Sequence, residues 1–561
     1  MQSNITKLWL QSRARRHLKY VSFSDLFSCY SNAEFVADHD DLCRFIHLTD
    51  DCNELVKIFN YLEYMVCQLK LDKSAKSLTA ILAISIAIFI VYSSIVYVVG
   101  RYFIVPNVVM LAERFKMSDF EFGATLLTAF ITLPAFTETI SVCGSSSGNG
   151  SMVLAEMIGK LFACFSGGFV TFCIKRNFSV QPKTFVFHML VIIIGLIYVY
   201  ETMFYKIAND HELPENRVSF NLSIHAAFLL IFYIIFLSLT WIKSSAIKKD
   251  EISEDSVSIT DSLPSDDYEE NENPIEYDLD GWELLFKSCS PFKNDVKAHV
   301  IIKTYITPIW FICSFMIPVY TKDRPLNGWC KLQTLTSFLL FPVCFYFVAT
   351  EQLFYASLFV CLLFAVLTLI ITRKQQEPTL HELYAMFGIL AATNVYFLID
   401  SELDNLMWQL LNYLADWKTD VALLISSPIA QIILVSVFSN CLVEQNHAKM
   451  AYGMIIGVAM FFTFTSLPLM VVQSCYSPYM KTTVTSSTET AYYFMLDIYL
   501  LIFFGWSMSN FQLRRSLGIT ILIIDLVYVV FICSSASWLM HTYGCQHSLY
   551  MFQDLQHANW A

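Results

Sequence analysis

The chain has 561 residues, of which 56% are hydrophobic and only 15% carry a charge, and its mean hydropathy is +0.52. Soluble domains contain about 25% charged residues, so this composition excludes an ordinary soluble enzyme. The formal net charge is −12, and the acidic stretch at 250–280 supplies essentially all of it. The rest of the chain is nearly neutral, so we expect a lipid bilayer around it and no nucleic-acid partner.

Residues 1–77 are predicted to form a basic, cysteine-bearing segment ahead of the first span. No acidic residue occurs before Asp25, whereas Lys and Arg recur. This pattern fits a mitochondrial transit peptide and, equally, a basic arm held by anionic lipid. Four cysteines follow, and some of them are expected to pair if the segment faces an oxidising compartment. These are Cys29, Cys43, Cys52 and Cys67, with the connectivity open.

Apolar runs long enough to cross about 30 Å of hydrocarbon follow from residue 78 onward. They predict an all-α polytopic membrane protein with a first membrane half at 78–242, an acidic disordered loop at 243–298 and a second membrane half at 299–561. The runs are 79–100, 121–143, 152–174, 185–205, 222–242, 300–320, 333–349, 353–372, 381–399, 420–442, 450–473, 490–508 and 517–536.

Two of these runs, one in each half, carry polar residues and a proline at membrane depth. The first spans 123–142 and contains Pro134; the second begins at Val421 and contains Pro428. Unwound backbone is tolerated in lipid only where it lines a cavity, so matched interruptions point to the substrate site of a transporter. The sequence shows no phosphate loop, zinc-binding histidine pair or hydrolase elbow, so we predict a transporter and not an enzyme.

The order of these features resembles the cation/calcium exchanger superfamily, and most nearly its mitochondrial sodium/calcium exchanger branch. The features are Tyr61-Leu62-Glu63 ahead of Cys67, five spans, an acidic loop, Trp282 and a second set of spans. The resemblance implies two inverted repeats of about five transmembrane helices, with extra flanking spans and broken helices at the midplane. Their α-repeats would lie at about 120–175 and about 420–473.

The same resemblance implies a function. It implies sodium-coupled calcium antiport by alternating access, with Na⁺ and Ca²⁺ as transported ions, no cofactor and a role in calcium homeostasis. It is compatible with a homo-oligomer or a hetero-oligomer with related exchangers. The membrane implied is the mitochondrial inner membrane or the plasma membrane.

The ligand positions of the family motifs are altered in this chain. In the first repeat Gly123, Thr125 and Pro134 match, but the family's Asn falls on Ile131 and its Asp on Ala135. Both principal side-chain ligands of this repeat are therefore replaced by apolar residues.

The second repeat is altered in the same way. Lys449 and the Met and Ala after it set the register, which places Gln431 on the family's Asn, Val435 on its first Asp and Ser439 on a further Asp. The amide position is therefore retained as Gln431, whereas the two acidic positions carry Val435 and Ser439.

Glu138 is the only carboxylate near the first interruption and lies one helical turn from Ala135, so it is the single metal-ligand candidate. An intramembrane glutamate is functional by default, with a solvated loop end as the alternative. Neutral oxygens complete the candidate ion site, although helical hydroxyls more often bond the preceding turn. They belong to Thr125, Thr128, Thr132, Gln431, Ser439 and Asn440.

Three functions stay open at this point. Ca²⁺ takes six to eight oxygens and prefers several carboxylates, so a site with one carboxylate suits Na⁺, K⁺ or H⁺ better. The chain is then a sodium/calcium antiporter, a monovalent cation or proton exchanger, or a transport-silent paralogue that regulates an active exchanger. Glu156 and Lys160, four residues apart, are expected to form an ion pair with a structural role.

Overall fold

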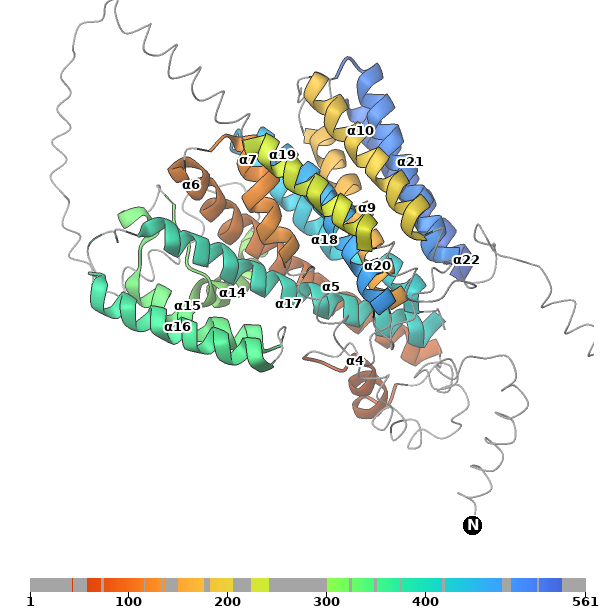
Figure 1. Ribbon diagram of the computed structural model, residues 1–561. Helices are drawn as coiled ribbons and strands as arrows, with labels where there is room; N and C mark the ends of the chain where they lie inside the picture. Colours follow the sequence, from red (N-terminus) through yellow and green to blue (C-terminus); the bar gives the residue numbers. More distant parts are fainter. Residues whose placement is uncertain are drawn as a thin grey trace, which may run out of the picture.

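The computed structural model is helical throughout its regular elements in the part of the chain that it describes (Figure 1). Ten of the described helices are long and apolar enough to cross a membrane, which confirms the predicted all-α polytopic fold. The predicted loop at 243–298, Pro134 and Glu138 lie outside the described residues. The structure describes residues 43, 58–71, 75–115, 117–133, 136, 150–175, 182–204, 223–241, 300–321, 325–347, 351–373, 376, 378, 380–415, 419–476, 486–511 and 514–536.

The first membrane half contains five helical units in the described residues. The first is a long span that passes through a π-helical turn, and the second begins with a short helix that continues through another π-helical turn to Leu133. The elements are α5 (Ala75–Val99), η3 (Gly100–Ile104), α6 (Val105–Phe115), α7 (Asp119–Phe122), η4 (Gly123–Leu127), α9 (Gly150–Lys175), α10 (Pro182–Val199), η5 (Tyr200–Phe204) and the helix Ser223–Trp241.

The second membrane half ends in five corresponding units, which again start with a long helix. They are α17 (His381–Ala415), α18 (Thr419–Glu444), α19 (Ala448–Phe461) with η7 (Phe462–Ser466) and α20 (Leu467–Tyr476), α21 (Ser486–Met508) and α22 (Arg515–Ala536). The order long helix, repeat pair, two further helices therefore occurs twice.

Three additional helices lie between these two sets in the sequence, and in Figure 1 they group together at one side of the molecule. They are α14 (Val300–Met316), α15 (Lys331–Tyr346), preceded by the turn η6 (Pro325–Gly328), and α16 (Glu351–Ile371). The sequence predicts full spans at 300–320 and 333–349, but α14 and α15 have 17 and 16 residues. A spanning helix needs about 20 residues, so these two are shorter than expected.

The helices of the two repeats pack crosswise, meaning that each helix of one repeat packs against the non-equivalent helix of the other. α19 lies along α7 and η4, and α9 lies along α18. His447 Nδ1, at the start of α19, is 3.1 Å from Asp119 Oδ2, at the start of α7. Lys175 Nζ, at the end of α9, is 3.3 Å from Glu444 Oε1, at the end of α18. The helices of each pair are therefore parallel.

This crosswise packing establishes the inverted relation between the repeats. α18 and α19 are joined by a short turn and run in opposite directions. Because α7 is parallel to α19, it is antiparallel to α18, its counterpart in the other repeat. The long helices α5 and α17 obey the same rule, since Ile81 packs beside Leu406 and Asn107 beside Gly388. An inverted-topology repeat is the arrangement in which a central site is shared between two halves.

Glycines allow the closest approach in this packing. A Cβ atom on Gly123 would lie 2.1 Å from the carbonyl oxygen of Met450, and one on Gly453 would lie 2.4 Å from that of Phe120. Both contacts involve backbone atoms, which side-chain rotation cannot move. Small residues at helix contacts are the usual means of close packing in membranes.

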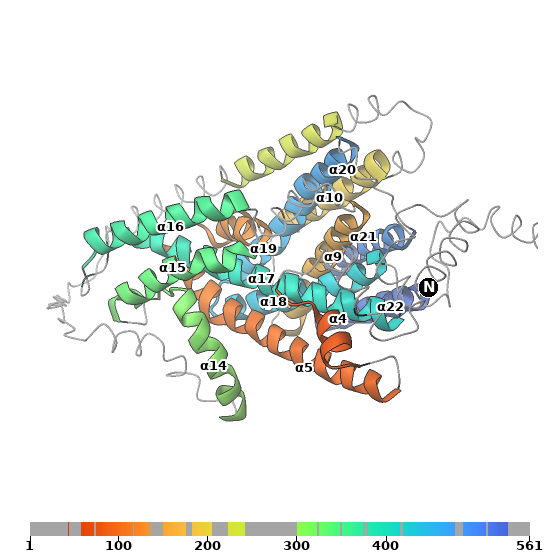
Figure 2. The same cartoon turned by 90° about the horizontal axis from the view of Figure 1, so that it is seen from below.

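Burial separates central from peripheral helices. In an 18-residue apolar stretch of the α9 span 89% of the residues are buried, and in that of the α19 span 83%. The corresponding shares are 11% for the Ser223–Trp241 helix and 17% for the α16 span. The exposed side chains of the two peripheral helices are largely apolar. A helix that is apolar all round and exposed is expected to face lipid, and in Figure 2 the Ser223–Trp241 helix and α16 lie at the edge of the bundle, with α9 and α19 farther in.

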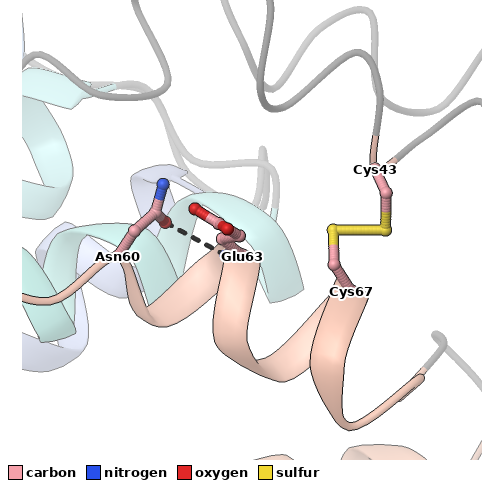
Figure 3. Close-up of a disulfide and its surroundings, with 4 residues drawn as sticks. All are labelled: Cys43, Asn60, Glu63 and Cys67. Atoms are coloured by element: carbon pink, nitrogen blue, oxygen red, sulfur yellow. Dashed lines mark hydrogen bonds between the residues drawn. A yellow bond between two sulfur atoms is a disulfide. The ribbon is translucent and has the colours of Figure 1, made fainter.

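The chain before the first span is held by a disulfide (Figure 3). Cys43 and Cys67 are bonded, with their Cα atoms 5.5 Å apart. Next to it the side-chain oxygen of Asn60 accepts a hydrogen bond of 3.0 Å from the backbone N–H of Glu63 and caps α4 (Tyr61–Glu63), which continues into η2 (Tyr64–Gln68). The predicted pairing thus involves Cys43 and Cys67. Cys29 and Cys52 lie outside the described residues.

Candidate functional site

The three threonines predicted in the first repeat bond their own helix. The hydroxyl of Thr125 donates to the carbonyl of Glu121 at 2.7 Å. That of Thr128 donates to Gly123 at 2.8 Å, and that of Thr132 donates to Thr128 at 2.9 Å. This is the bonding that helical threonines usually make. Their oxygens keep lone pairs for a further partner, but their hydrogens are already used.

Pro428 lies inside α18, which is helical from Thr419 to Glu444. The predicted interruption is therefore a proline within a continuous helix. Proline has no N–H for the carbonyl four residues earlier, that of Leu424. The hydroxyl of Tyr528, on α22, donates to this carbonyl at 3.3 Å. A neighbouring helix thus satisfies the group that the proline leaves free, as is common in membrane helices.

The remaining second-repeat candidates lie in three different settings. Gln431 is buried, and its Oε1 accepts a hydrogen bond of 2.9 Å from the hydroxyl of Tyr396 on α17. Ser439 is buried, and its hydroxyl has no hydrogen-bond partner among the described residues. Asn440 is half-buried and donates to Glu444 at 3.2 Å, so it faces the end of α18. Of the three, Gln431 alone joins a larger polar group.

That group is built around Lys160, whose side chain is 2% exposed. Its ammonium nitrogen lies 2.5 Å from Oε1 of Glu156, one turn earlier on α9, and 3.3 Å from Oδ2 of Asp400 on α17. Tyr396 precedes Asp400 by one turn and bonds Gln431. We call these five residues the central polar cluster: Glu156, Lys160, Tyr396, Asp400 and Gln431.

The central polar cluster draws on three helices that pack around one another. α9 contributes Glu156 and Lys160, and it approaches α18 closely, because a Cβ on Gly159 would lie 2.6 Å from the Ser427 hydroxyl oxygen. That hydroxyl lies 3.2 Å from the carbonyl oxygen of Glu156. Since α9 belongs to the first repeat and α18 to the second, the cluster lies at the junction of the two repeats.

The sequence predicted a structural ion pair of Glu156 with Lys160, and the two residues are indeed in contact. It missed Asp400, because the predicted span ends at residue 399 before a run of polar residues. The structure continues α17 to Ala415. A helical signal was available, since Tyr396, Asp400 and Asp404 recur every four residues and therefore share a face.

A second polar face of α17 holds the chain before the first span. Glu402, Asn405 and Gln409 follow the spacing i, i+3 and i+7, which places them on one side of the helix. Asn405 Nδ2 donates to the carbonyl of Phe59 at 3.0 Å. The backbone N–H of Ile58 donates to Glu402 Oε1 at 2.9 Å. One face of α17 therefore contributes to the central polar cluster, and the opposite face binds the chain before the first span.

The site has one feature that bears on ion choice. No three His, Cys, Asp or Glu side chains among the described residues are grouped so that they could hold a metal ion. Within the central polar cluster, two carboxylates face a lysine ammonium. A divalent cation prefers a higher density of carboxylates than this.

Comparison with known proteins gives a family match over the first membrane half. Residues 84–242 match the family model of the sodium/calcium exchanger protein. That part of the chain is therefore similar to the sodium/calcium exchanger family, which indicates a membrane transporter rather than an enzyme. A search of curated proteins returned no match.

Solved structures give a weak overall likeness. The chain is similar to structures of the sodium-calcium exchanger NCX_Mj. One, soaked with 2.5 mM Na⁺ and 10 mM Sr²⁺, has 13% sequence identity and a TM-score of 0.37, covering 80% of this chain and 98% of that one. Another, soaked with 10 mM Na⁺ and no Ca²⁺, has 14% identity and a TM-score of 0.36, covering 81% and 99%. At these scores the likeness adds nothing to the packing described above.

Proposed function

We propose that this chain is a cation antiporter that exchanges Na⁺ for Ca²⁺ by alternating access, with its ion site between the two inverted repeats. The family match over residues 84–242 supports cation exchange. The crosswise packing of α7 with α19 and of α9 with α18 supports a site shared by the repeats. Such a site becomes accessible from either side when one half rocks against the other.

The central polar cluster is the observation that carries this proposal. Charged side chains inside a membrane protein are costly and mark ion paths by default. Here Asp400 and Lys160 are almost completely buried, and they lie where helices of both repeats meet. A bundle held together only for stability would be served as well by apolar residues at these positions.

The ligands proposed from the sequence extend this site. Glu138 would supply the first-repeat carboxylate, and Gln431 would contribute its amide oxygen from the second repeat, where it adjoins the cluster. The hydroxyl oxygens of Thr125, Thr128 and Thr132 and the polar groups of Ser439 and Asn440 remain proposals of the same kind. Pro134 would supply a backbone irregularity beside them, whereas Pro428 lies within the continuous helix α18.

Flux in proteoliposomes tests the function. The purified protein is reconstituted, a Na⁺ gradient is imposed, and ⁴⁵Ca²⁺ uptake is measured, with K⁺ and H⁺ gradients as alternative drivers. We expect Na⁺-dependent uptake in the wild type and its loss in Glu138→Gln. Glu382→Gln, at the start of α17 and remote from the cluster, is the matched control and should retain uptake.

A second candidate function has its own support. The chain would be a transport-silent paralogue that regulates an active exchanger, and the scarcity of grouped carboxylates in the described residues favours this. Folded protein that shows neither ⁴⁵Ca²⁺ uptake nor ²²Na⁺ flux under any of the three gradients would favour this candidate over the first. Uptake of ⁴⁵Ca²⁺ driven by K⁺ or H⁺ alone would show calcium exchange against that ion, whereas ²²Na⁺ flux without ⁴⁵Ca²⁺ uptake would establish a monovalent cation or proton exchanger.

The membrane is a separate proposal. The basic first 24 residues favour the mitochondrial inner membrane and the mitochondrial exchanger branch. A carboxy-terminal tag imaged against mitochondrial and plasma-membrane markers tests this, with deletion of residues 1–24 as the comparison. Mitochondrial targeting that survives the deletion would contradict a transit peptide.

A further inference from the structure

Lys160 is the most deeply buried cation among the described ion pairs. Its side chain is 2% exposed, while that of Lys175, on the same helix, is 47% exposed. Removing an ammonium from water carries a large desolvation penalty even after the protein relaxes around it. The Lys160 side chain is therefore retained at a substantial cost, which two carboxylates from two helices offset.

The ammonium lies between carboxylates of two helices, where a monovalent cation could otherwise bind. Its nitrogen is in contact with oxygens of Glu156 and Asp400. An ammonium group is close in charge and size to a dehydrated K⁺ ion. The ammonium is, however, fixed to α9 and cannot leave with a transported ion. It thus occupies a cation position permanently.

The charges of the cluster show how the Lys160 ammonium affects ion binding. Glu156 and Asp400 together carry two negative charges, and the Lys160 ammonium cancels one of them. A neutral residue at position 160 would remove the positive charge that faces Glu156 and Asp400, and carboxylate oxygens are the ligands that Ca²⁺ prefers.

We propose that Lys160 is a tethered cation that occupies one ion position of the central polar cluster and so determines its ion specificity. This inference rests on the proposed function. The ammonium offsets part of the negative charge of Glu156 and Asp400, which favours a monovalent ion such as the Na⁺ of the proposed exchange at this cluster and weakens, without abolishing, the binding of Ca²⁺ there. Lys160 is therefore a specificity-determining residue, and its removal opens a divalent-cation site.

Equilibrium binding of ⁴⁵Ca²⁺ to the purified full-length chain in detergent tests this. We expect Lys160→Ala to bind Ca²⁺ at least about tenfold more tightly than the wild type, because the repulsion of a unit charge at contact distance is removed. Lys175→Ala is the matched control: it removes the same charge from the same helix, at its exposed end, and should leave the affinity within about twofold of the wild type.

Two further variants separate specificity from structure. Lys160→Arg keeps the charge and should bind Ca²⁺ as weakly as the wild type. The double variant Lys160→Ala with Asp400→Asn removes a ligand together with the tethered cation and should lose the gain. Should Lys160→Ala fail to fold, Lys160→Gln preserves the polar character and takes its place.

The outcomes are distinguishable from those of the flux assay. Unchanged Ca²⁺ affinity in a folded Lys160→Ala or Lys160→Gln protein would overturn the tethered-cation role, whether or not the wild type transports. An equal gain in Lys175→Ala would also overturn it, because the effect would then be a general one of net charge. A gain confined to position 160 supports it, even in a wild-type protein that shows no flux.

Discussion

The backbone N–H of Leu62 donates a hydrogen bond of 2.8 Å to Oε1 of Gln409, a residue 347 positions further along the chain. This bond belongs to the second polar face of α17, which holds residues 58–71 against the end of the helix. Tyr61, Leu62, Met65 and Val66 pack there with Ile81 and Leu406 in a small apolar cluster of their own. The segment before the first span therefore ties the two long helices α5 and α17 together.

Glu402 is the residue whose loss should weaken this attachment most. It accepts from the Ile58 N–H at 2.9 Å and from the Tyr61 hydroxyl at 2.7 Å. Burial raises the pKa of Tyr61, and its hydrogen bonds to Tyr92 and Glu402 raise it further, so the phenol stays protonated and donates. Hydrogen bonds to charged groups contribute about 1.5–3 kcal/mol each.

We therefore expect Glu402→Ala to lower the free energy of unfolding by about 3 kcal/mol or more. Thermal unfolding in detergent measures this, and limited proteolysis measures the release of residues 58–71. Glu382→Ala, on the same helix, serves as control and should change the stability by less than about 0.5 kcal/mol. Equal stability of the two variants would show that the hydrogen bonds of Glu402 contribute nothing net.

The disulfide between Cys43 and Cys67 should stabilise the same attachment. It closes a loop with a sequence separation of 24, for which chain entropy gives a stabilisation of about 3 kcal/mol. We expect Cys67→Ser to lose about that amount and to speed proteolysis of the segment. Cys533→Ser, a free and half-buried cysteine, is the control.

Peptide mapping under non-reducing conditions provides an independent check on the bond. A disulfide persists in an oxidising compartment, so we expect the linked Cys43 and Cys67 peptides from protein made in its native membrane. Free thiols at both positions would place the segment on a reducing side and remove its contribution to stability.

Much of this architecture could be predicted from the sequence, because its determinants are local. Spans follow from runs of apolar residues, but the interruption predicted at Pro428 is a proline within a continuous helix. The limits of the spans were less accurate where polar residues are buried. The run after Ile399 resembles the end of a span, but its two polar faces are covered, one by α9 and the other by residues 58–71.

The central polar cluster could not be assembled from sequence for a related reason. The pairing of Glu156 with Lys160 is local and was predicted, whereas Asp400 reaches them only through tertiary packing. The contact between Tyr396 and Gln431 likewise joins two helices. Hydrophobic periodicity specifies which face of a helix is buried, but it does not specify the partner helix.

Close packing of the repeats should make Gly453 intolerant of a side chain. A Cβ there would lie 2.4 Å from the carbonyl oxygen of Phe120 and 3.1 Å from the nitrogen of Ala124. Both are backbone atoms, so α19 must move away from α7 and η4. We expect Gly453→Ala to cost about 1–3 kcal/mol and to reduce any flux.

Gly505→Ala is the matched control for this variant. A Cβ at Gly505 would meet a terminal carbon of the Leu517 side chain at 2.7 Å, and a flexible side chain can rotate away. Thermal unfolding of the two variants should therefore separate them by more than 1 kcal/mol. Similar losses would show that the contact between the repeats is looser than the structure indicates.

The hydrogen bond from Tyr396 to Gln431 links α17 to the second repeat and is open to a double-mutant cycle. Its length is 2.9 Å, and both residues are buried. We expect Tyr396→Phe to lower the free energy of unfolding by about 1–2 kcal/mol, because the amide oxygen of Gln431 loses its donor in a buried site. Adding Gln431→Leu should then cost less than it does alone, with a coupling energy of about 1 kcal/mol. Strict additivity of the two substitutions would mean that the bond is not formed in the membrane-embedded protein, and that Gln431 is free to take another partner.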